Sequence, residues 1–395
     1  MHKRFGLTLF AGLAIIVAAC SSGGATTAPS AEASVAAPPS AEASVEASVE
    51  ASAAAGSDLK IGVVTDIGTL NDKGFNEYSY KGAAQGAEDI GAATPPSVVP
   101  KDQSEYAKAI QDYVDQSFDI IVTVGFNLTS STTKAAKANP DIWFIGVDQS
   151  PCVDADGNDD PTFACAGDAG ALLPHYASLT FKEDQAGYLA GIVAAAVSKT
   201  GQIGAIGGTT LCAPCVRYIQ GYELGAKSVN PDILVKSAYV TRDFSAAAFA
   251  DQPGGKSFAN NFLTTNSKVD VLFAVAGLTG NGVLDAAAAK GIYGVGVDVD
   301  QFLSYPAVGP YLITSAEKHL QSAVDQTIKA IADGSAKGGN GLFDATNDGI
   351  GASPFHDTAS VVPADTQAKL DAALEAMKAG TLVTCPADSC GVGPS

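Results

Sequence analysis

The stretch from 71 to 82, NDKGFNEYSYKG, places amide, carboxylate and aromatic side chains close together at Asn71, Asp72, Phe75 and Asn76. None of these groups pairs a nucleophile with a base, so the stretch does not predict covalent catalysis. A ring flanked by hydrogen-bonding groups can instead hold a flat polar molecule, which stacks on the ring while its edge is read by the neighbouring groups. Structural roles stay open, because Asn71 and Asp72 are good helix N-cap residues and Phe75 can pack in a core.

Similar groups follow other apolar runs of the chain. Asp148 and Asp298 end the runs IWFIGVD and GIYGVGVD, where a carboxylate must be solvated or paired. Phe244 lies shortly after ILVKSAYV, Gly277 lies in AVAGLTG, and Lys318 follows LITSAE. The glycine can simply allow a turn into a helix, and the ring can belong to the core. Because such groups recur at the ends of the runs, we expect them to line one cleft for a small polar ligand with a flat ring.

The apolar runs that carry these side chains are short, and longer amphipathic stretches separate them. Near-continuous Val and Ile runs are typical of strands buried on both faces, and their alternation with helices predicts parallel sheets. The expected strands are 59–65, 97–100, 119–125, 142–148, 177–181, 202–208, 233–240, 269–277, 291–298 and 309–317. Ligands of such sheets bind at the carboxyl ends of the strands, where the polar and aromatic groups stand.

The strands form two series, one ending near 177 and the other beginning near 182. This arrangement predicts an α/β protein with two doubly wound parallel-sheet lobes joined by a hinge. The first lobe is expected to comprise 58–177 and about 305–335. The second lobe is expected to comprise 178–304 and about 336–395.

The composition narrows the class of partner. The formal net charge is −19, and an acidic surface repels nucleic acids and anionic lipids. The sequence has no GxSxG or HExxH motif, its four histidines are scattered, and GAIGGTT lacks the spacing of a dinucleotide or P-loop motif. We therefore expect a binding protein that is not an enzyme and that has no cofactor, no metal and no nucleic-acid partner.

The first twenty residues combine a basic start, an apolar run and small residues before Cys20. This pattern predicts an export signal at 1–20, since the run is too short for a transmembrane helix. The ending VAAC resembles the lipobox of bacterial lipoproteins, in which the cysteine becomes lipidated; a chance cysteine is the alternative. Residues 21–57 are small, polar, Pro-punctuated and partly repetitive, which predicts a disordered tether. A lipid on Cys20 would hold the protein on the extracytoplasmic face of the cell membrane.

Six further cysteines stand close together in sequence pairs. They are Cys152, Cys165, Cys212, Cys215, Cys385 and Cys390. An oxidising compartment favours three local disulfides, although the sequence leaves their connectivity open. The CAPC sequence at 212–215 could instead be a redox motif or part of a metal site, but no second ligand pair is placed for a zinc ion. The run DADGNDD at 154–160 is similar to a calcium loop with a misplaced glycine, and we expect a solvated loop there.

From about 58 to 360 the chain resembles the basic membrane protein family of ABC-transporter substrate-binding lipoproteins. That family includes purine nucleoside receptors and is similar to type I periplasmic binding proteins. The resemblance is carried, in order, by NDKGFNEYSYKGA, NPDIWFIGVD, LTFKEDQAGYLAGIVAA, TGQIGAIGG, RYIQGYELGAKSVNP, LFAVAGLTGNGVLDAA, GVGVDVDQ and LITSAEKHL. One departure is Gly74, which stands where the family has serine.

The resemblance implies how the base of a nucleoside would be held. In the similar receptors the base lies between aromatic residues of the two lobes, with amide and carboxylate groups at its edge. This implies Phe75 as the ring of the first lobe, and Asn71 with Asp148 at the base edge. Phe244 is the candidate for the opposing ring. The alternatives for that ring are Phe126 and Tyr218.

The resemblance also implies how the sugar would be held. Asp298 would accept from the ribose hydroxyls, Lys318 would donate to a sugar oxygen, and Gly277 would allow close backbone approach. The expected function is that of a monomeric receptor that closes over a nucleoside, with a purine favoured, and presents it to an ABC permease. Three alternatives remain open: another solute such as a sugar, a surface lipoprotein without a transport role, and a thiol redox enzyme that uses CAPC.

Overall fold

The computed structural model describes residues 57–66 and 68–394. The predicted signal at 1–20, Cys20 with its predicted lipid, and all of the predicted tether at 21–57 except Ser57 lie outside the described residues. The backbone N–H of Ser57 donates to the carbonyl oxygen of Ile90 at 3.1 Å. Within the described part of the chain, no helix is both long enough and apolar enough to cross a membrane.

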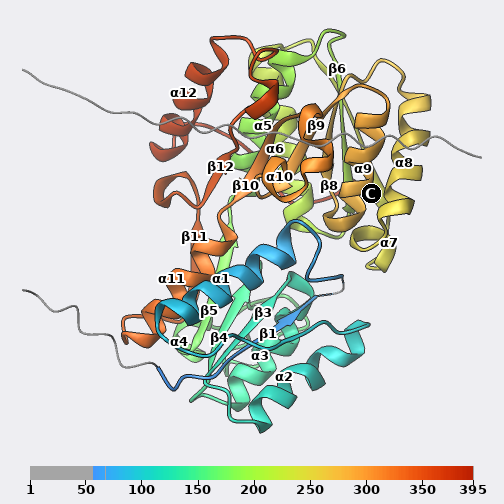
Figure 1. The fold of residues 1–395 in the computed structure, drawn as a ribbon. Coiled ribbons are helices and arrows are strands. Elements are labelled where there is room, and N and C mark those ends of the chain that lie inside the picture. The colour runs from blue at the N-terminus through green and yellow to red at the C-terminus, as the bar shows by residue number, and fades with distance from the viewer. Residues whose placement is uncertain (1–56, 67, 395) are drawn as a thin grey trace, which may run out of the picture. The chain divides into compact units, whose positions relative to one another are not determined.

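A first six-stranded sheet has the order β11-β5-β4-β3-β1-β2, and its neighbouring strands all pair in parallel (Figure 1). Its strands are β1 Ile61–Thr65, β2 Ser97–Val98, β3 Ile120–Val124, β4 Trp143–Val147, β5 Tyr176–Phe181 and β11 Gly339–Phe343. Every residue of β1 and β3 is buried, as expected for Val and Ile runs covered on both faces.

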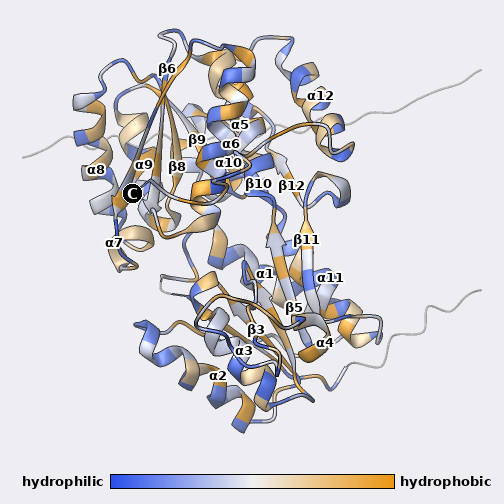
Figure 2. Cartoon of the chain, turned by 180° about the vertical axis from the view of Figure 1, so that it is seen from behind, coloured by the Kyte–Doolittle hydropathy of each residue, from blue (hydrophilic) through white to orange (hydrophobic). Residues whose placement is uncertain are grey.

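Helices from two distant parts of the chain cover the first sheet. They are α1 Phe75–Asp89, α2 Tyr106–Asp115, α3 Thr129–Ala138, α4 Ala169–Leu172 and α11 Leu320–Ala332. Helix α11 packs along α1 and contacts β4 and β5. Figure 2 shows mixed hydrophilic and hydrophobic colours on outer helices such as α2, whose buried residues are separated by exposed ones. An apolar stripe on an otherwise polar helix is what one-sided packing against a sheet requires.

A second six-stranded sheet has the order β12-β10-β9-β8-β6-β7. Its strands are β6 Gln202–Thr209, β7 Leu234–Thr241, β8 Val271–Val275, β9 Tyr293–Asp298, β10 Leu312–Lys318 and β12 Ile350–Ala352. All pairs are parallel except β12, which runs antiparallel to β10. The two mostly parallel sheets confirm the predicted fold class of two α/β lobes.

The helices of the second lobe begin with a tightly packed pair, α5 and α6. The full set is α5 Glu183–Val197, α6 Ala213–Val229, α7 Ala246–Phe249, α8 Gln252–Thr265, α9 Gly277–Ala289, α10 Gln301–Ser304 and α12 Thr366–Lys378. A Cβ added at Gly187 or Gly221 would collide with the backbone oxygen of Tyr218 or Asp184 on the facing helix. The glycines therefore let the two helix backbones approach closely and fix α6 against α5.

The described residues also form five short 3₁₀ helices. They are η1 Gln103–Glu105, η2 Phe126–Leu128, η3 Pro306–Tyr311, η4 Ala345–Asn347 and η5 His356–Thr358.

The chain passes between the two sheets after β5, after β10 and after β11. The lobe boundaries expected from the sequence differ from the observed sheets at these crossings. Residues 178–181 belong to the first sheet as part of β5, residues 312–318 form β10 of the second sheet, and residues 339–343 form β11 of the first. The reason is physical: an apolar run predicts a strand, but it does not reveal which partner the strand pairs with. Helix α11, at 320–332, does pack on the first lobe.

Three local disulfides are present, as the cysteine spacing predicted. They join Cys152 to Cys165, Cys212 to Cys215, and Cys385 to Cys390. In the loop at 154–160 the carboxylate of Asp154 accepts from the backbone N–H groups of Asp156 and Asn158. Among residues 57–66 and 68–394, no group of three or more His, Cys, Asp or Glu side chains is arranged to hold a metal ion.

Candidate functional site

One cavity lies where the carboxyl ends of strands from both sheets meet. Its first-lobe wall includes Asp66, Asp72, Phe75, Asn76, Phe126 and Asp148. Its second-lobe wall includes Cys212, Cys215, Tyr218, Phe249, Asp298 and Lys318. The space between these walls, counted together with the solvent at its opening, is about 670 Å³.

The start of α1 is organised by Asp72. Its carboxylate accepts from the backbone N–H groups of Gly74 and Asn76 at 2.9 Å and of Glu77 at 3.1 Å. These bonds satisfy amides that have no partner within the helix, so Asp72 caps α1 with its side chain although the N-cap residue is Gly74. Burial raises the pKa of Asp72, and the three backbone hydrogen bonds oppose that rise. The cap directs Phe75, the first residue of α1, toward the cavity.

Asn76 lies on the cavity wall, whereas Asn71, which the resemblance implied, does not. The side chain of Asn71 is exposed, accepts from the Nζ of Lys73 and is not part of the cavity wall. Asn76 is buried on the cavity wall, and its Oδ1 has no hydrogen-bond partner among residues 57–66 and 68–394. A buried amide oxygen without a partner is costly, so it marks a position where a ligand donor would be welcome.

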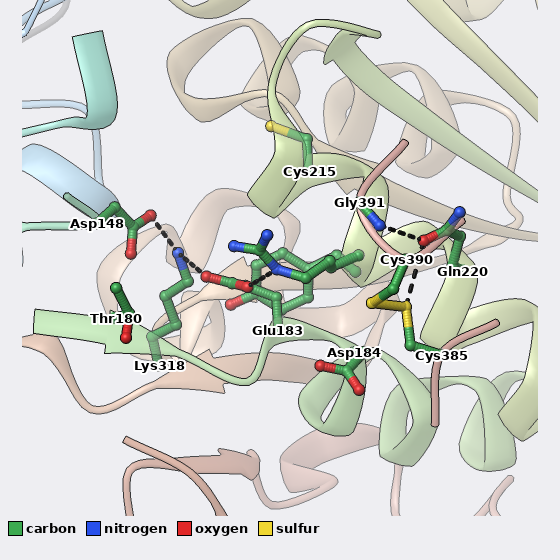
Figure 3. Close-up of polar contacts among 12 residues, drawn as sticks. Asp148, Thr180, Glu183, Asp184, Cys215, Gln220, Lys318, Cys385, Cys390 and Gly391 are labelled. Carbon is green, nitrogen blue, oxygen red and sulfur yellow. Dashed lines mark hydrogen bonds and ion pairs between the residues drawn. A yellow bond between two sulfur atoms is a disulfide. The ribbon is translucent and has the colours of Figure 1, made fainter. Parts of the chain in front are cut away.

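Lys318 joins the two lobes through a buried charge cluster (Figure 3). Its Nζ lies 2.5 Å from Oδ2 of Asp148, 3.1 Å from Oε1 of Glu183 and 4.0 Å from Oδ1 of Asp298. Arg217 donates from Nε to Oε2 of Glu183 at 2.6 Å. Asp148 follows β4 of the first sheet and Asp298 ends β9 of the second, so the ammonium group bridges the carboxyl ends of both sheets.

The electrostatics of this cluster shift the pKa values of its members. Burial raises the pKa of Asp148 to about 6 and that of Asp298 to about 6, and in both cases Lys318 opposes the rise. Burial alone would lower the pKa of Lys318, but Asp148, Glu183 and Asp298 together raise it above its ordinary value. Burial acts to raise the pKa of Glu183, whereas Lys318 and Arg217 bring it below its usual value. The lysine therefore stays charged while Asp148 and Asp298 are held in an unfavourable ionised state.

Asp148 and Asp298 also share an uncommon backbone conformation. Their φ angles are 56° and 67°, in the left-handed region that few residues other than glycine adopt. Each such position costs of order 1 kcal/mol or more and is retained where the surroundings determine it. With this backbone conformation, one carboxylate from each lobe lines the same cavity.

Aromatic rings reach the cavity from both lobes, but not in the pair that the resemblance implied. Phe75 and Phe126 line it from the first lobe, and Phe249 of α7 lines it from the second. Phe244 is not part of the wall; its ring packs against that of Phe126, with centroids 5.1 Å apart. Phe249 could have been suspected by the rule that selected Phe244, because both follow β7.

The remaining predicted residues lie in the cavity wall. Tyr218, one of the alternatives for the opposing ring, is buried, and its hydroxyl donates to Oδ1 of Asp298 at 3.2 Å. Gly277 has a φ of 51°, and a Cβ there would lie 3.2 Å from the backbone oxygen of Phe249. The structure thus brings together Phe75, Asp148, Gly277, Asp298 and Lys318 and leaves out Asn71 and Phe244.

Direct contacts between the lobes close over the start of α1. Asn281 donates from Nδ2 to the carbonyl oxygen of Asp72 at 2.9 Å, and Ser304 donates to that of Lys73 at 2.7 Å. Gln301 orients Asn281 by donating to its Oδ1 at 2.9 Å. These bonds hold the two lobes together at the start of α1.

Comparison with known proteins identifies a matching family. The family model described as "ABC transporter substrate-binding protein PnrA-like" matches residues 59–383. "ABC transporter nucleoside-binding protein BmpA" of Lactococcus lactis is 27% identical over 337 residues, which cover 80% of this chain and 87% of that protein. "Basic membrane protein A" of Borreliella burgdorferi is 29% identical over 276 residues, which cover 68% of this chain and 71% of that protein.

A solved structure shows the same fold. It is an ABC transporter solute-binding protein from Aeropyrum pernix, with a TM-score of 0.68 and 22% sequence identity. The likeness covers 84% of this chain and 95% of that one.

Proposed function

Because this chain belongs to the family of PnrA-like ABC transporter substrate-binding proteins, we propose that it captures a nucleoside, preferably a purine nucleoside, between its two lobes. In this proposal it works outside the cytoplasm, is anchored through a lipid on Cys20, and hands the nucleoside unchanged to a membrane permease. The observation that carries the proposal is the shared cavity, in which Phe75 of one lobe meets Asp298 and Lys318 of the other.

The walls suit the two halves of a nucleoside. A purine base can stack on Phe75, and Phe249 of the second lobe lines the same cavity and can oppose it, as can Tyr218. Asn76 and Asp148 offer acceptors for the amino and ring N–H groups of the base, and Oδ1 of Asp148 is buried without a partner in the part of the chain that the structure describes. Unpaired acceptors favour a ligand that can satisfy them and reject one that cannot.

The sugar would be held on the second-lobe side. A carboxylate can accept from two neighbouring hydroxyl groups at once, and Asp298 is held for this by Tyr218. Lys318 stays protonated and can donate to a sugar oxygen, although it also serves Asp148 and Glu183.

The charge of the wall favours a solute without phosphate. Four aspartates line the cavity, at 66, 72, 148 and 298, and Lys318 supplies the cationic group that faces them. A nucleotide would bring further negative charge into this low-dielectric space, where like charges repel strongly. A neutral nucleoside avoids that repulsion.

Calorimetric titration of the purified protein would test the proposal, with guanosine, adenosine, cytidine, guanosine monophosphate and ribose as separate ligands. We expect binding of the purine nucleosides, weaker binding of cytidine and ribose, and no binding of the monophosphate. Recovery of intact guanosine by chromatography would agree with a non-enzymatic role. Binding of ribose or another sugar in place of nucleosides would favour the sugar alternative, and binding of no solute would refute the proposed role.

A further inference from the structure

We propose that the Cys212–Cys215 disulfide is a specificity-determining wall of the cleft, which contacts the bound nucleoside and fixes the first turn of α6. This inference rests on the proposed function, because it concerns the solute held at the same site. It assigns a ligand-facing role to the CAPC sequence in place of the redox or metal roles that the sequence left open.

The Cys212–Cys215 disulfide lies in the cavity wall. Cys212, Pro214 and Cys215 all line the cavity, and both sulfur-bearing side chains are buried there. Neither Cys152–Cys165 nor Cys385–Cys390 is part of that wall. Polarisable sulfur packs favourably against aromatic rings, which is the kind of surface a nucleoside base presents.

The disulfide and Pro214 also shape the N-terminus of α6. Cys212 is the N-cap residue of α6, and its Sγ accepts from the backbone N–H of Cys215 at 3.2 Å. Pro214 has no N–H, and the N–H of Val216 already donates to the carbonyl oxygen of Cys212. The N-terminus of a 17-residue helix, usually attractive to anions, is thereby closed by sulfur and proline. The wall therefore offers a nucleoside base a packing surface and offers a phosphate little.

The next turn of α6 carries two residues that contact the buried charge cluster, Arg217 and Tyr218. Arg217 binds Glu183, which holds Lys318, and Tyr218 binds Asp298. A disulfide that fixes the turn before them also fixes the bases of these two side chains. Preorganisation of this kind lowers the entropy lost when a ligand binds.

The C-terminal segment contacts α6 one turn further along, at Gln220, and also contacts the loop before the helix, at Thr210. Gln220 of α6 accepts from the backbone N–H of Gly391 at 2.8 Å and donates to the carbonyl oxygen of Ser389 at 2.9 Å (Figure 3). A Cβ added at Gly393 would lie 2.5 Å from the backbone oxygen of Thr210. The start of α6 thus lies between the cavity and the C-terminal segment.

Global stability is a weaker explanation for this disulfide. The sequence separation of its cysteines is 3, compared with 13 for Cys152–Cys165 and 5 for Cys385–Cys390. A disulfide that closes a shorter loop removes less entropy from the unfolded chain. Of the three disulfides, Cys212–Cys215 is therefore expected to stabilise the fold least by this mechanism, and it is the one that lies at the cavity.

The first experiment compares two double variants by calorimetric titration with guanosine. Cys212→Ala/Cys215→Ala is expected to weaken binding at least about tenfold, the lower end of what one missing group in a hydrophobic pocket is worth. Cys152→Ala/Cys165→Ala is the matched control and should keep the wild-type affinity, because that disulfide lies outside the cavity wall. Equal affinity of the Cys212→Ala/Cys215→Ala variant and wild type would overturn the inference.

A second measurement uses the wild-type protein, so it does not depend on the folding of a variant. Partial reduction with a phosphine, followed by alkylation and peptide mass spectrometry, gives a reduction rate for each disulfide. Saturating guanosine should slow reduction of Cys212–Cys215 at least about tenfold and leave that of Cys152–Cys165 unchanged. Guanosine binding without such protection refutes the contact and leaves the proposed function standing. If no nucleoside binds, both the proposed contact and the proposed function are refuted.

Discussion

Replacing Asp298 by asparagine should stabilise the ligand-free protein while it disables the site. Burial raises the pKa of Asp298 from 3.8 to about 6. At 1.36 kcal/mol per pKa unit, the ionised carboxylate costs the folded state about 3 kcal/mol at neutral pH. Asparagine has nearly the same shape and can still accept from Tyr218, but it carries no charge. Nucleoside binding should fall at least about tenfold, because a charged acceptor of the sugar hydroxyls is lost.

The pH dependence gives the sign of this effect. Below about pH 4 the carboxyl of Asp298 is protonated in both the folded and the unfolded chain, so the variant should gain nothing. As pH rises from about 4 to about 6, the folded state keeps a proton that the unfolded state loses, and wild-type stability falls relative to that of the variant. Above about pH 6 the full difference should be present.

Scanning calorimetry of both ligand-free proteins at about pH 8 and about pH 4 would measure the difference. For a folded part of about 340 residues, 3 kcal/mol corresponds to a rise in Tm of roughly 4 °C. Asp357→Asn is a suitable control, because that side chain is exposed. A lower Tm of the Asp298→Asn variant at about pH 8 would show that the ionised carboxylate stabilises the fold and would refute the reasoning.

Three further predictions concern the ring, the closure and the helix pair. Phe75→Ala should weaken guanosine binding roughly 5- to 150-fold, the equivalent of about 1–3 kcal/mol of stacking, and Phe244→Ala should weaken it less; equal losses in a titration would contradict the assignment of the rings. Asn281→Ala removes one hydrogen bond between the lobes, so the Kd should rise by about fivefold, and the Tm should fall because the buried side chain of Gln301 loses its acceptor; an unchanged Kd would show that this contact does not contribute to binding. Gly221→Ala places a methyl group against the backbone oxygen of Asp184 and should cost roughly 1–3 kcal/mol of stability, which calorimetry would detect; an unaltered Tm would show that α5 and α6 can move apart.

The strands of this fold could be predicted because burial on both faces leaves a direct mark on the sequence. The run at 119–125 contains the observed β3, and the run at 142–148 contains β4. The partner of a strand leaves no such mark. Residues 312–318 pair with β9 and residues 339–343 with β5, and only the packed structure decides this.

The site could be predicted where a side chain is placed by a strand end, and not where it depends on a loop. Asp148 directly follows β4 and Asp298 is the last residue of β9, so their location was fixed once the sheets were parallel. Asn71 lies before the capped turn of α1, and the phase of that helix brings Asn76 to the cavity instead. Phe249 reaches the wall because residues 246–249 form α7, a four-residue helix whose path the sequence pattern does not specify.

The repeated crossing of the chain has a consequence for its synthesis. The first sheet receives β11 only after residues 339–343 have left the ribosome, long after its other strands have emerged. Until then β5, a mostly buried strand, remains an unpaired edge. Premature termination anywhere between these two strands would therefore release a polypeptide with an open apolar edge, which favours aggregation.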